Sequence, residues 1–143
     1  MKKYLLLILI LCLPIYIIVN SNTVTTLKSP DGKTELAIST TYAKTAKSRT
    51  KGLMHVKDLP EYSGMLFIWD EYKKHKIWMK NTLIPLDIIF AKDNNIIFIK
   101  ENAQPHDLTV IDPPVPVNYV LEVNAGVVKN HDINKNWTLH TNH

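Results

Sequence analysis

The stretch from Gly64 to Phe90 carries two apolar segments of strand length, with charged and turn-forming residues between them. Met65–Trp69 is apolar at every position, and Leu86–Ala91 is interrupted by one carboxylate, Asp87. An unbroken apolar run of this length, bounded by turn residues, indicates a strand that is buried on both faces. We therefore expect this stretch to form the centre of a sheet.

The rest of the chain repeats this pattern of short strands about 8 to 12 residues apart, with turns between them. Lys92–Asn95 predicts a hairpin, because Asn and Asp tolerate positive φ. The other strands are expected at 34–40, 76–80, 96–100 and 119–123, with an edge strand in the tail through Trp137 and a frayed end over 139–143.

Helices are expected to be few and short. Thr41–Lys51 is rich in Ala and Lys and is stopped by Gly52, and a second helix is expected over Asn124–Asn130 with Asn124 as its N-cap. The four prolines within 101–117 predict a long loop. The fold class is therefore mainly β, a sandwich or open barrel with one or two short helices.

The amino-terminal end indicates export. Lys2 and Lys3 precede an uncharged apolar stretch over 4–19, which is typical of a secretory leader or an amino-terminal anchor. We expect a leader or anchor over 1–21, a tether over 22–33 and a single domain over 34–138, in a periplasmic or extracellular protein. The only cysteine, Cys12, lies in the leader, so disulfides and a cysteine nucleophile are excluded for the domain.

Charge and motifs exclude several functions. The formal net charge of +4 falls to +2 without Lys2 and Lys3, which is too small an excess to indicate nucleic acid binding. The chain has no glycine-rich phosphate loop, nucleophile elbow or zinc-protease motif.

Two carboxylates, Asp87 and Glu122, interrupt apolar strands. A carboxylate that faces a core must find a partner or take up a proton. Arg49, the only arginine, is the first candidate partner, together with Lys80 and Asn81. If these side chains converge, they form a small charged and hydrogen-bonding site.

This cluster, with Trp78 as a stacking floor, has three interpretations. It binds a small polar or anionic ligand, or it catalyses a reaction with Asp87 or Glu122 as the base and Lys80 as an electrostatic stabiliser. In the third, structural interpretation, Asp87 and Asn81 secure the 82–85 turn and Arg49 attaches the helix to the sheet. A protein partner is an alternative to the small ligand.

Methionines and histidines raise a further alternative, a copper site. Against it, the methionines lie in apolar settings where Met is ordinary core filling, and no short spacing joins the histidines. No metal site or cofactor is therefore predicted. The side chains concerned are Met54, His55, Met65, His75, Met79 and His106.

An ordered set of motifs resembles the domain of unknown function 192 family over roughly residues 35–133. The motifs are Arg49-x-x-Gly52-Leu53-Met54, Gly64-Met65-Leu66-Phe67, Trp78-Met79-Lys80-Asn81-Thr82-x-x-Pro85-Leu86-Asp87, Pro105 and Val120-Leu121-Glu122-x-x-x-Gly126. The resemblance implies a small, often exported protein with a compact jelly-roll-like β fold and no established activity. Members often carry Gly-Ile-x-x-Gly-Asp near the end, where this chain has residues 132–137 without glycine.

Overall fold

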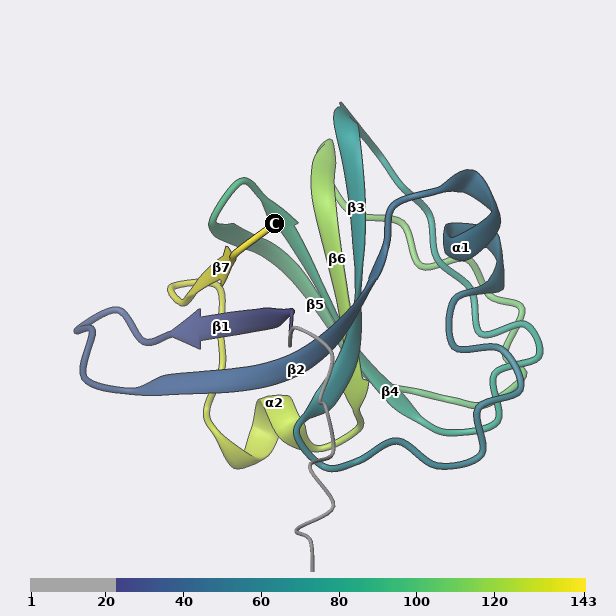
Figure 1. Cartoon of the computed structure of the whole chain (residues 1–143), viewed down its shortest axis with the longest axis horizontal. Coiled ribbons are helices and arrows are strands. Elements are labelled where there is room, and N and C mark those ends of the chain that lie inside the picture. The colour runs from purple at the N-terminus through teal and green to yellow at the C-terminus, as the bar shows by residue number, and fades with distance from the viewer. Residues whose placement is uncertain (1–22) are drawn as a thin grey trace, which may run out of the picture.

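The computed structural model describes residues 23–143, so the expected leader or anchor lies outside the described residues. The fold is mainly β, as expected, with seven strands and two short helices in the described range (Figure 1). The elements in chain order are β1 (Val24–Lys28), β2 (Glu35–Ala43), α1 (Ala46–Lys51), β3 (Ser63–Lys73), β4 (Leu86–Lys92), β5 (Asn95–Ala103), β6 (Val117–Asn124), α2 (Val127–Asn130) and β7 (Thr138–Thr141).

The strands form a closed barrel in the order β1-β2-β3-β6-β4-β5-β7. The pair β2–β3 is parallel, and the other neighbours are antiparallel. Parallel neighbours require a long crossover connection. Residues 44–62 supply it, with α1 inside it, so α1 lies against the outside of the barrel (Figure 1).

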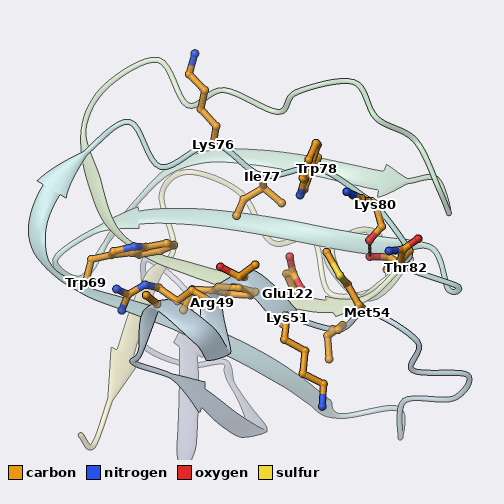
Figure 2. Close-up of a pocket in the computed structure, with 16 residues that line it drawn as sticks. Arg49, Lys51, Met54, Trp69, Lys76, Ile77, Trp78, Lys80, Thr82 and Glu122 are labelled. Carbon is orange, nitrogen blue, oxygen red and sulfur yellow. Dashed lines mark hydrogen bonds between the residues drawn. The ribbon is translucent and has the colours of Figure 1, made fainter.

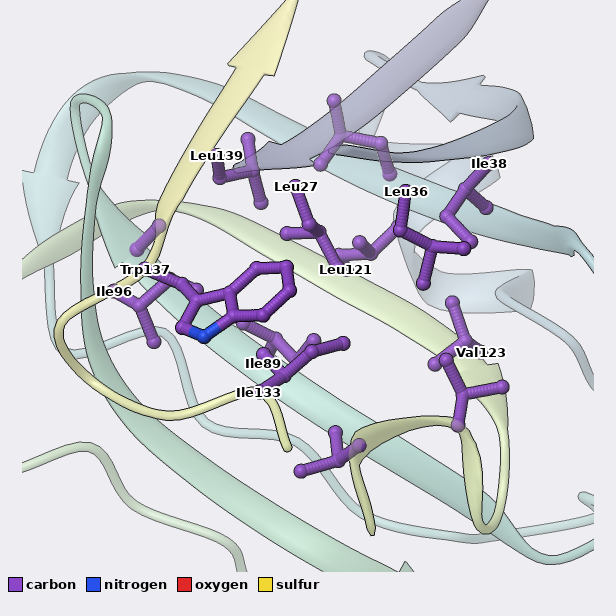
Figure 3. Close-up of a cluster of buried hydrophobic side chains, with 14 of the residues drawn as sticks. Leu27, Leu36, Ile38, Ile89, Ile96, Leu121, Val123, Ile133, Trp137 and Leu139 are labelled. Atoms are coloured by element: carbon purple, nitrogen blue, oxygen red, sulfur yellow. The ribbon is translucent and has the colours of Figure 1, made fainter. Parts of the chain in front are cut away.

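One hydrophobic cluster fills the barrel interior. All seven strands contribute to it, and Trp137, which precedes β7, packs among them (Figure 3). The interior side chains of the strands are Leu27, Leu36, Ile38, Leu66, Ile68, Ile89, Ala91, Ile96, Leu121, Val123 and Leu139.

A second cluster lies on the outer face of β3, β6 and β4. The alternate residues of these strands, such as Phe67, Val120 and Phe90, pack there against buried side chains of the connecting segments. Met79 and Ile111 come from the β3–β4 and β5–β6 connections. Burial of the Met65–Trp69 run on both faces is thus confirmed, and the pocket described below is built in this outer layer.

Several boundaries differ from expectation. Val24–Lys28, in the segment assigned to a tether, is strand β1 and pairs with both β2 and β7. The first residues of the expected helix over 41–51 extend β2 instead, and α1 begins only after its N-cap, Thr45. The hairpin at 92–95 is confirmed, with Asp93 at φ 53°.

The expected strand over 76–80 is wrong, because this segment makes only one isolated bridge, between Ile77 and Ile111. Its alternation is nevertheless real: Met79 is buried, whereas Trp78 and Lys80 are exposed. The fraying expected over 139–143 is also wrong for 139–141, because these residues belong to β7.

Around α2, the N-cap is Gly126 rather than Asn124. Asp132, in the glycine-free segment after α2, adopts φ 54° and so takes a conformation that glycine adopts more readily. Within residues 23–143, neither helix has the length and apolar character needed to cross a bilayer.

Candidate functional site

A pocket of about 630 Å³ lies between the outer face of the barrel and two connecting segments (Figure 2). Its floor is formed by β3 and β6, one wall by α1 and the residues after it, and the other wall by residues 76–82. The lining residues are Ala46, Arg49, Thr50, Lys51, Gly52, Leu53, Met54, Phe67, Trp69, Lys76, Ile77, Trp78, Lys80, Asn81, Thr82 and Glu122. Five of the six residues predicted for the site are therefore brought together, and Asp87 is not.

The α1 wall is fixed by local signals at both ends of the helix. Thr45 and Ser48 form a reciprocal capping box at its start. Gly52 ends it at φ 49°, and a Cβ on Gly52 would lie 3.1 Å from the Phe67 ring. A glycine is thus required here both by backbone conformation and by the close approach of α1 to the floor of the pocket.

Arg49 attaches α1 to the sheet. Its Nη1 donates to the carbonyl oxygens of Lys44 at 2.5 Å and Ile68 at 2.9 Å. Its guanidinium carbon also lies 5.4 Å from the centre of the Trp69 ring, within the range of a cation–π contact. Arg49 therefore makes the link between the helix and the sheet that the structural interpretation expected of it.

Trp69 and His75 form a stack beside Arg49, with ring centres 3.9 Å apart and planes 9° from parallel. Burial is the main cause that lowers the pKa of His75 from its ordinary value. Sequence reasoning did not select Trp69 as a site residue. The available signal was its position at the end of the apolar run, where β3 leaves the buried part of the sheet.

The opposite wall presents Trp78 and Lys80 on one side of the chain, as their alternation predicts. The Lys80 Nζ lies 5.1 Å from the centre of the Trp78 ring, and Trp78 is 48% exposed. Trp78 therefore stands at the mouth of the pocket and not on its floor. Asn81 turns the chain at φ 53°, and its carbonyl accepts a hydrogen bond from the His55 backbone at 2.9 Å.

Glu122 lies on the floor of the pocket and is only 5% exposed. Its neighbours in the sheet are Met65 on β3 and Ile88 on β4, which offer no polar partner. Burial raises the pKa of the Glu122 carboxyl from 4.5 to about 8, so this group holds its proton at neutral pH.

The Glu122 carboxyl has no hydrogen-bond partner among residues 23–143 and is not sealed off. In that range every fully enclosed side-chain oxygen or nitrogen has a hydrogen-bond partner. The Glu122 oxygens are therefore reached from the pocket, and Figure 2 shows this side chain among the lining residues.

Asp87 lies elsewhere and makes none of the contacts expected with Arg49, Lys80 or Asn81. It is 1% exposed, and its carboxylate accepts hydrogen bonds from the backbone N–H groups of Asn102 at 2.9 Å, Gly126 at 3.0 Å and Val128 at 2.9 Å. These bonds tie β4 to β5 and to the start of α2. Alternation along a strand does not reveal which backbone amides a carboxylate will meet.

The charges that line the pocket are mostly positive. Among residues 23–143, the charged residues that line the pocket are Arg49, Lys51, Lys76, Lys80 and one carboxyl group, that of Glu122. Lys76 is ion-paired with Asp112 at 3.3 Å, and Figure 2 shows its side chain directed away from the pocket. Within the described residues, no group of three or more His, Cys, Asp or Glu side chains has the geometry of a metal site.

Comparison with solved structures finds clear relatives of the whole fold. One, from Sinorhizobium meliloti 1021 and described as a proposed transcription regulator, has 36% sequence identity and a TM-score of 0.80, over 85% of this chain and 94% of its own. Another, a protein of unknown function from Novosphingobium aromaticivorans DSM 12444, has 31% identity and a TM-score of 0.77, over 82% of this chain and 83% of its own.

The comparison with curated proteins gives no significant match. The sequence profile of the family DUF192, described as "Uncharacterized ACR, COG1430", matches residues 26–141, which span all of the barrel except its first two residues. The ordered motifs and the barrel agree with this match, and the chain belongs to the DUF192 family.

Proposed function

We propose that this protein is an exported, non-enzymatic module that binds a small polar or anionic ligand in the pocket between α1, residues 76–82 and β6. A saccharide or another component of the cell envelope fits this description. The observation that carries the proposal is Glu122, a buried carboxyl group that has no hydrogen-bond partner among residues 23–143 and opens into the pocket. A buried polar group that lacks a partner is costly, and a ligand that bonds to it offsets that cost.

The size and the lining of the pocket support this proposal. Its volume falls within the range of small-molecule sites, which are roughly 300 to 1,000 Å³. Apolar and aromatic side chains such as Phe67 and Trp78 are combined with a few polar groups, namely Asn81, Lys80 and Glu122. This combination is usual where the ligand has both an apolar surface and groups that must be oriented.

Export is proposed from the sequence, because Lys2 and Lys3 precede the apolar stretch over 4–19. We also propose that nucleic acid is not the partner. The transcription role belongs to the description of the Sinorhizobium protein, and the small net charge of this chain does not favour it.

A thermal-shift screen of the full chain against sugars, cell-wall fragments, small anions and copper or zinc ions tests the proposal. A ligand at ~100 times its dissociation constant adds about 2.7 kcal/mol to the free energy of unfolding. We expect a shift with at least one polar or anionic compound that disappears in Lys80→Ala. The control is Lys129→Ala in α2, because Lys129 does not line the pocket.

No shift with any class of compound would overturn the small-ligand proposal and favour a protein partner instead. A shift that is equal in Lys80→Ala and in the native chain would place the ligand outside this pocket.

A second candidate function is catalysis with Glu122 as a general acid or base and Lys80 as an electrostatic stabiliser. A carboxyl group with a pKa of about 8 exchanges its proton near neutral pH, which suits this role. Asp87 is not a candidate for the general base, because its carboxylate already accepts hydrogen bonds from three backbone N–H groups. Mass spectrometry of the bound compound before and after incubation separates the two functions, because only an enzyme consumes it.

A further inference from the structure

We infer that the pocket selects small molecules that carry an oxyanion, either a carboxylate or a phosphoryl group, and that this oxyanion accepts a hydrogen bond from the Glu122 carboxyl. The inference rests on the proposed function and narrows its ligand class. It implies that binding requires a proton on Glu122 and weakens in alkaline solution.

Cations outnumber carboxylates around the pocket. Lys76 is neutralised by Asp112, and Figure 2 shows that the Lys51 side chain is directed away from the pocket. This leaves Arg49 and Lys80 as cations that no carboxylate among residues 23–143 pairs with. Arg49 uses only Nη1 for its bonds to the backbone, and its Nε and Nη2 make no hydrogen bond within that range. The mouth of the pocket therefore attracts anions.

The floor of the pocket offers a hydrogen-bond donor. Because Glu122 holds its proton at neutral pH, its carboxyl group donates one hydrogen bond there. An O–H donor is bound most strongly by a charged oxygen. A cationic ligand would need Glu122 to be ionised and would also be repelled by the rim, so the observations favour an anion.

The groups around the Glu122 carboxyl that could change its pKa are neutral or cationic. From β3 and β4, the neighbours of Glu122 are Met65 and Ile88, neither of which titrates. From α1, the charged groups that line the pocket are Arg49 and Lys51, and from residues 76–82 they are Lys76 and Lys80. Among residues 23–143, Glu122 is thus the only acidic group that lines the pocket.

The experiment measures binding to the full chain by tryptophan fluorescence, because Trp69 and Trp78 both line the pocket. The probes are D-glucuronate for the carboxylate and glucose 6-phosphate for the phosphoryl group, with glucose as the uncharged control. At pH 7 we expect at least one acidic probe to bind at least 10-fold more tightly than glucose. The acidic probe that binds shows whether the pocket takes a carboxylate or a phosphoryl group.

The pH dependence tests the role of Glu122. With a pKa of about 8, its protonated fraction falls roughly 30-fold between pH 7 and pH 9.5. The affinity for the acidic probe should fall by about the same factor. In Glu122→Gln the amide N–H donates at every pH, so the affinity should stay within about 3-fold of the native value at pH 7 and be nearly constant up to pH 9.5.

A matched pair of lysine variants keeps the test decisive even if Glu122→Gln fails to fold. Lys80→Gln should weaken the acidic probe about 10-fold and leave glucose unchanged, whereas Lys129→Gln, which changes the net charge equally, should change neither, because Lys129 lies in α2 and does not line the pocket. Equal loss in both variants would contradict the inference.

The outcomes distinguish the two proposals. If glucose binds as tightly as the acids, or if the affinity for the acids does not change with pH in the native chain, the pocket binds small molecules but the oxyanion inference is wrong. If neither the acids nor glucose shows saturable binding, and the thermal-shift screen is also negative, the proposed function itself fails.

Discussion

Asp87 and Glu122 are both carboxyl groups buried in strands, but their surroundings give them different roles. Three backbone N–H groups donate hydrogen bonds to the Asp87 side chain, whereas Glu122 has apolar neighbours in the sheet and opens into a pocket. One residue therefore holds the fold together, and the other is available to a ligand.

The role of Asp87 predicts a loss of stability in Asp87→Asn. The amide NH₂ of Asn presents donors to backbone N–H groups that need acceptors, and buried donors without partners cost about 1–3 kcal/mol each. We expect the free energy of unfolding to fall by about 3 kcal/mol, measured by urea denaturation. Lys80→Ala, at an exposed pocket residue, is the control and should stay within about 0.5 kcal/mol of the native chain; a larger loss there would mean that Lys80 is structural.

Glu122 makes the stability of the protein depend on pH. The folded carboxyl keeps its proton up to about pH 8, whereas an ordinary carboxyl releases it near pH 4.5. Between these values the folded state binds more protons than the unfolded state, so the free energy of unfolding falls as pH rises. The total contribution is up to about 5 kcal/mol.

Glu122→Gln removes this ionisation and isolates its effect. Relative to the native chain, the variant should be no more stable at about pH 4 and more stable by several kcal/mol at about pH 9. Urea denaturation at both pH values measures the difference. A difference that does not change with pH would show that Glu122 ionises in the folded protein much as it does in the unfolded chain.

At the scale of the elements, the barrel depends on close contact between β3 and β6. Gly64 faces β6, where a Cβ would lie only 2.4 Å from the Glu122 carbonyl oxygen and 3.1 Å from a Val123 methyl group. Both atoms belong to β6, the strand that pairs with β3. The carbonyl is part of the backbone, so it cannot move away from an added Cβ without distorting the sheet.

Gly64→Ala should therefore destabilise the protein by about 3 kcal/mol or more. The matched control is Gly32→Ala, in the β1–β2 turn, where a Cβ meets nothing within 4 Å and the cost is limited to the strain at φ 69°, about 1 kcal/mol. Thermal melting compares the two variants. Equal losses would mean that β3 and β6 can separate locally at low cost.

The same elements show how far a sequence specifies this structure. The 92–95 hairpin follows from local turn chemistry. The burial of residues 65–69 of β3 on both faces follows from their unbroken apolar run. The alternation of buried and exposed side chains predicted over 76–80 is also present. This segment is nevertheless not a strand, because a strand needs a neighbouring strand to pair with. The prolines at 113, 114 and 116 leave only one bridge, at Ile111.

Distant pairing explains what the sequence could not predict. β1 is a polar-looking segment, and it is a strand because β2 and β7 flank it, the latter more than 100 residues away in the chain. At the site, Arg49, Trp78, Lys80, Asn81 and Glu122 do line one pocket. Asp87 is absent from the pocket because its carboxylate turns to the amides near α2, a contact that no spacing rule encodes.

At the scale of the whole molecule, β7 closes the barrel. It pairs with β1 along four residues and with β5 through Asn95 and Thr138. Its Leu139 is 1% exposed and packs in the interior cluster beside Leu27. Without β7, the edges of β1 and β5 would be unpaired, and the barrel interior would open to water.

A chain that ends after Trp137 should consequently lose cooperative folding. The lost interior side chain alone costs about 2–5 kcal/mol, and a barrel with unpaired edges favours aggregation. We expect no cooperative unfolding transition by circular dichroism and a loss of the far-ultraviolet β signal or precipitation. Removal of His143 alone is the control and should retain a native-like transition, since this residue is exposed and lies beyond β7. If the shorter chain instead unfolds cooperatively with most of its native stability, the barrel does not need to close, and β1 to β6 form an independent open sheet.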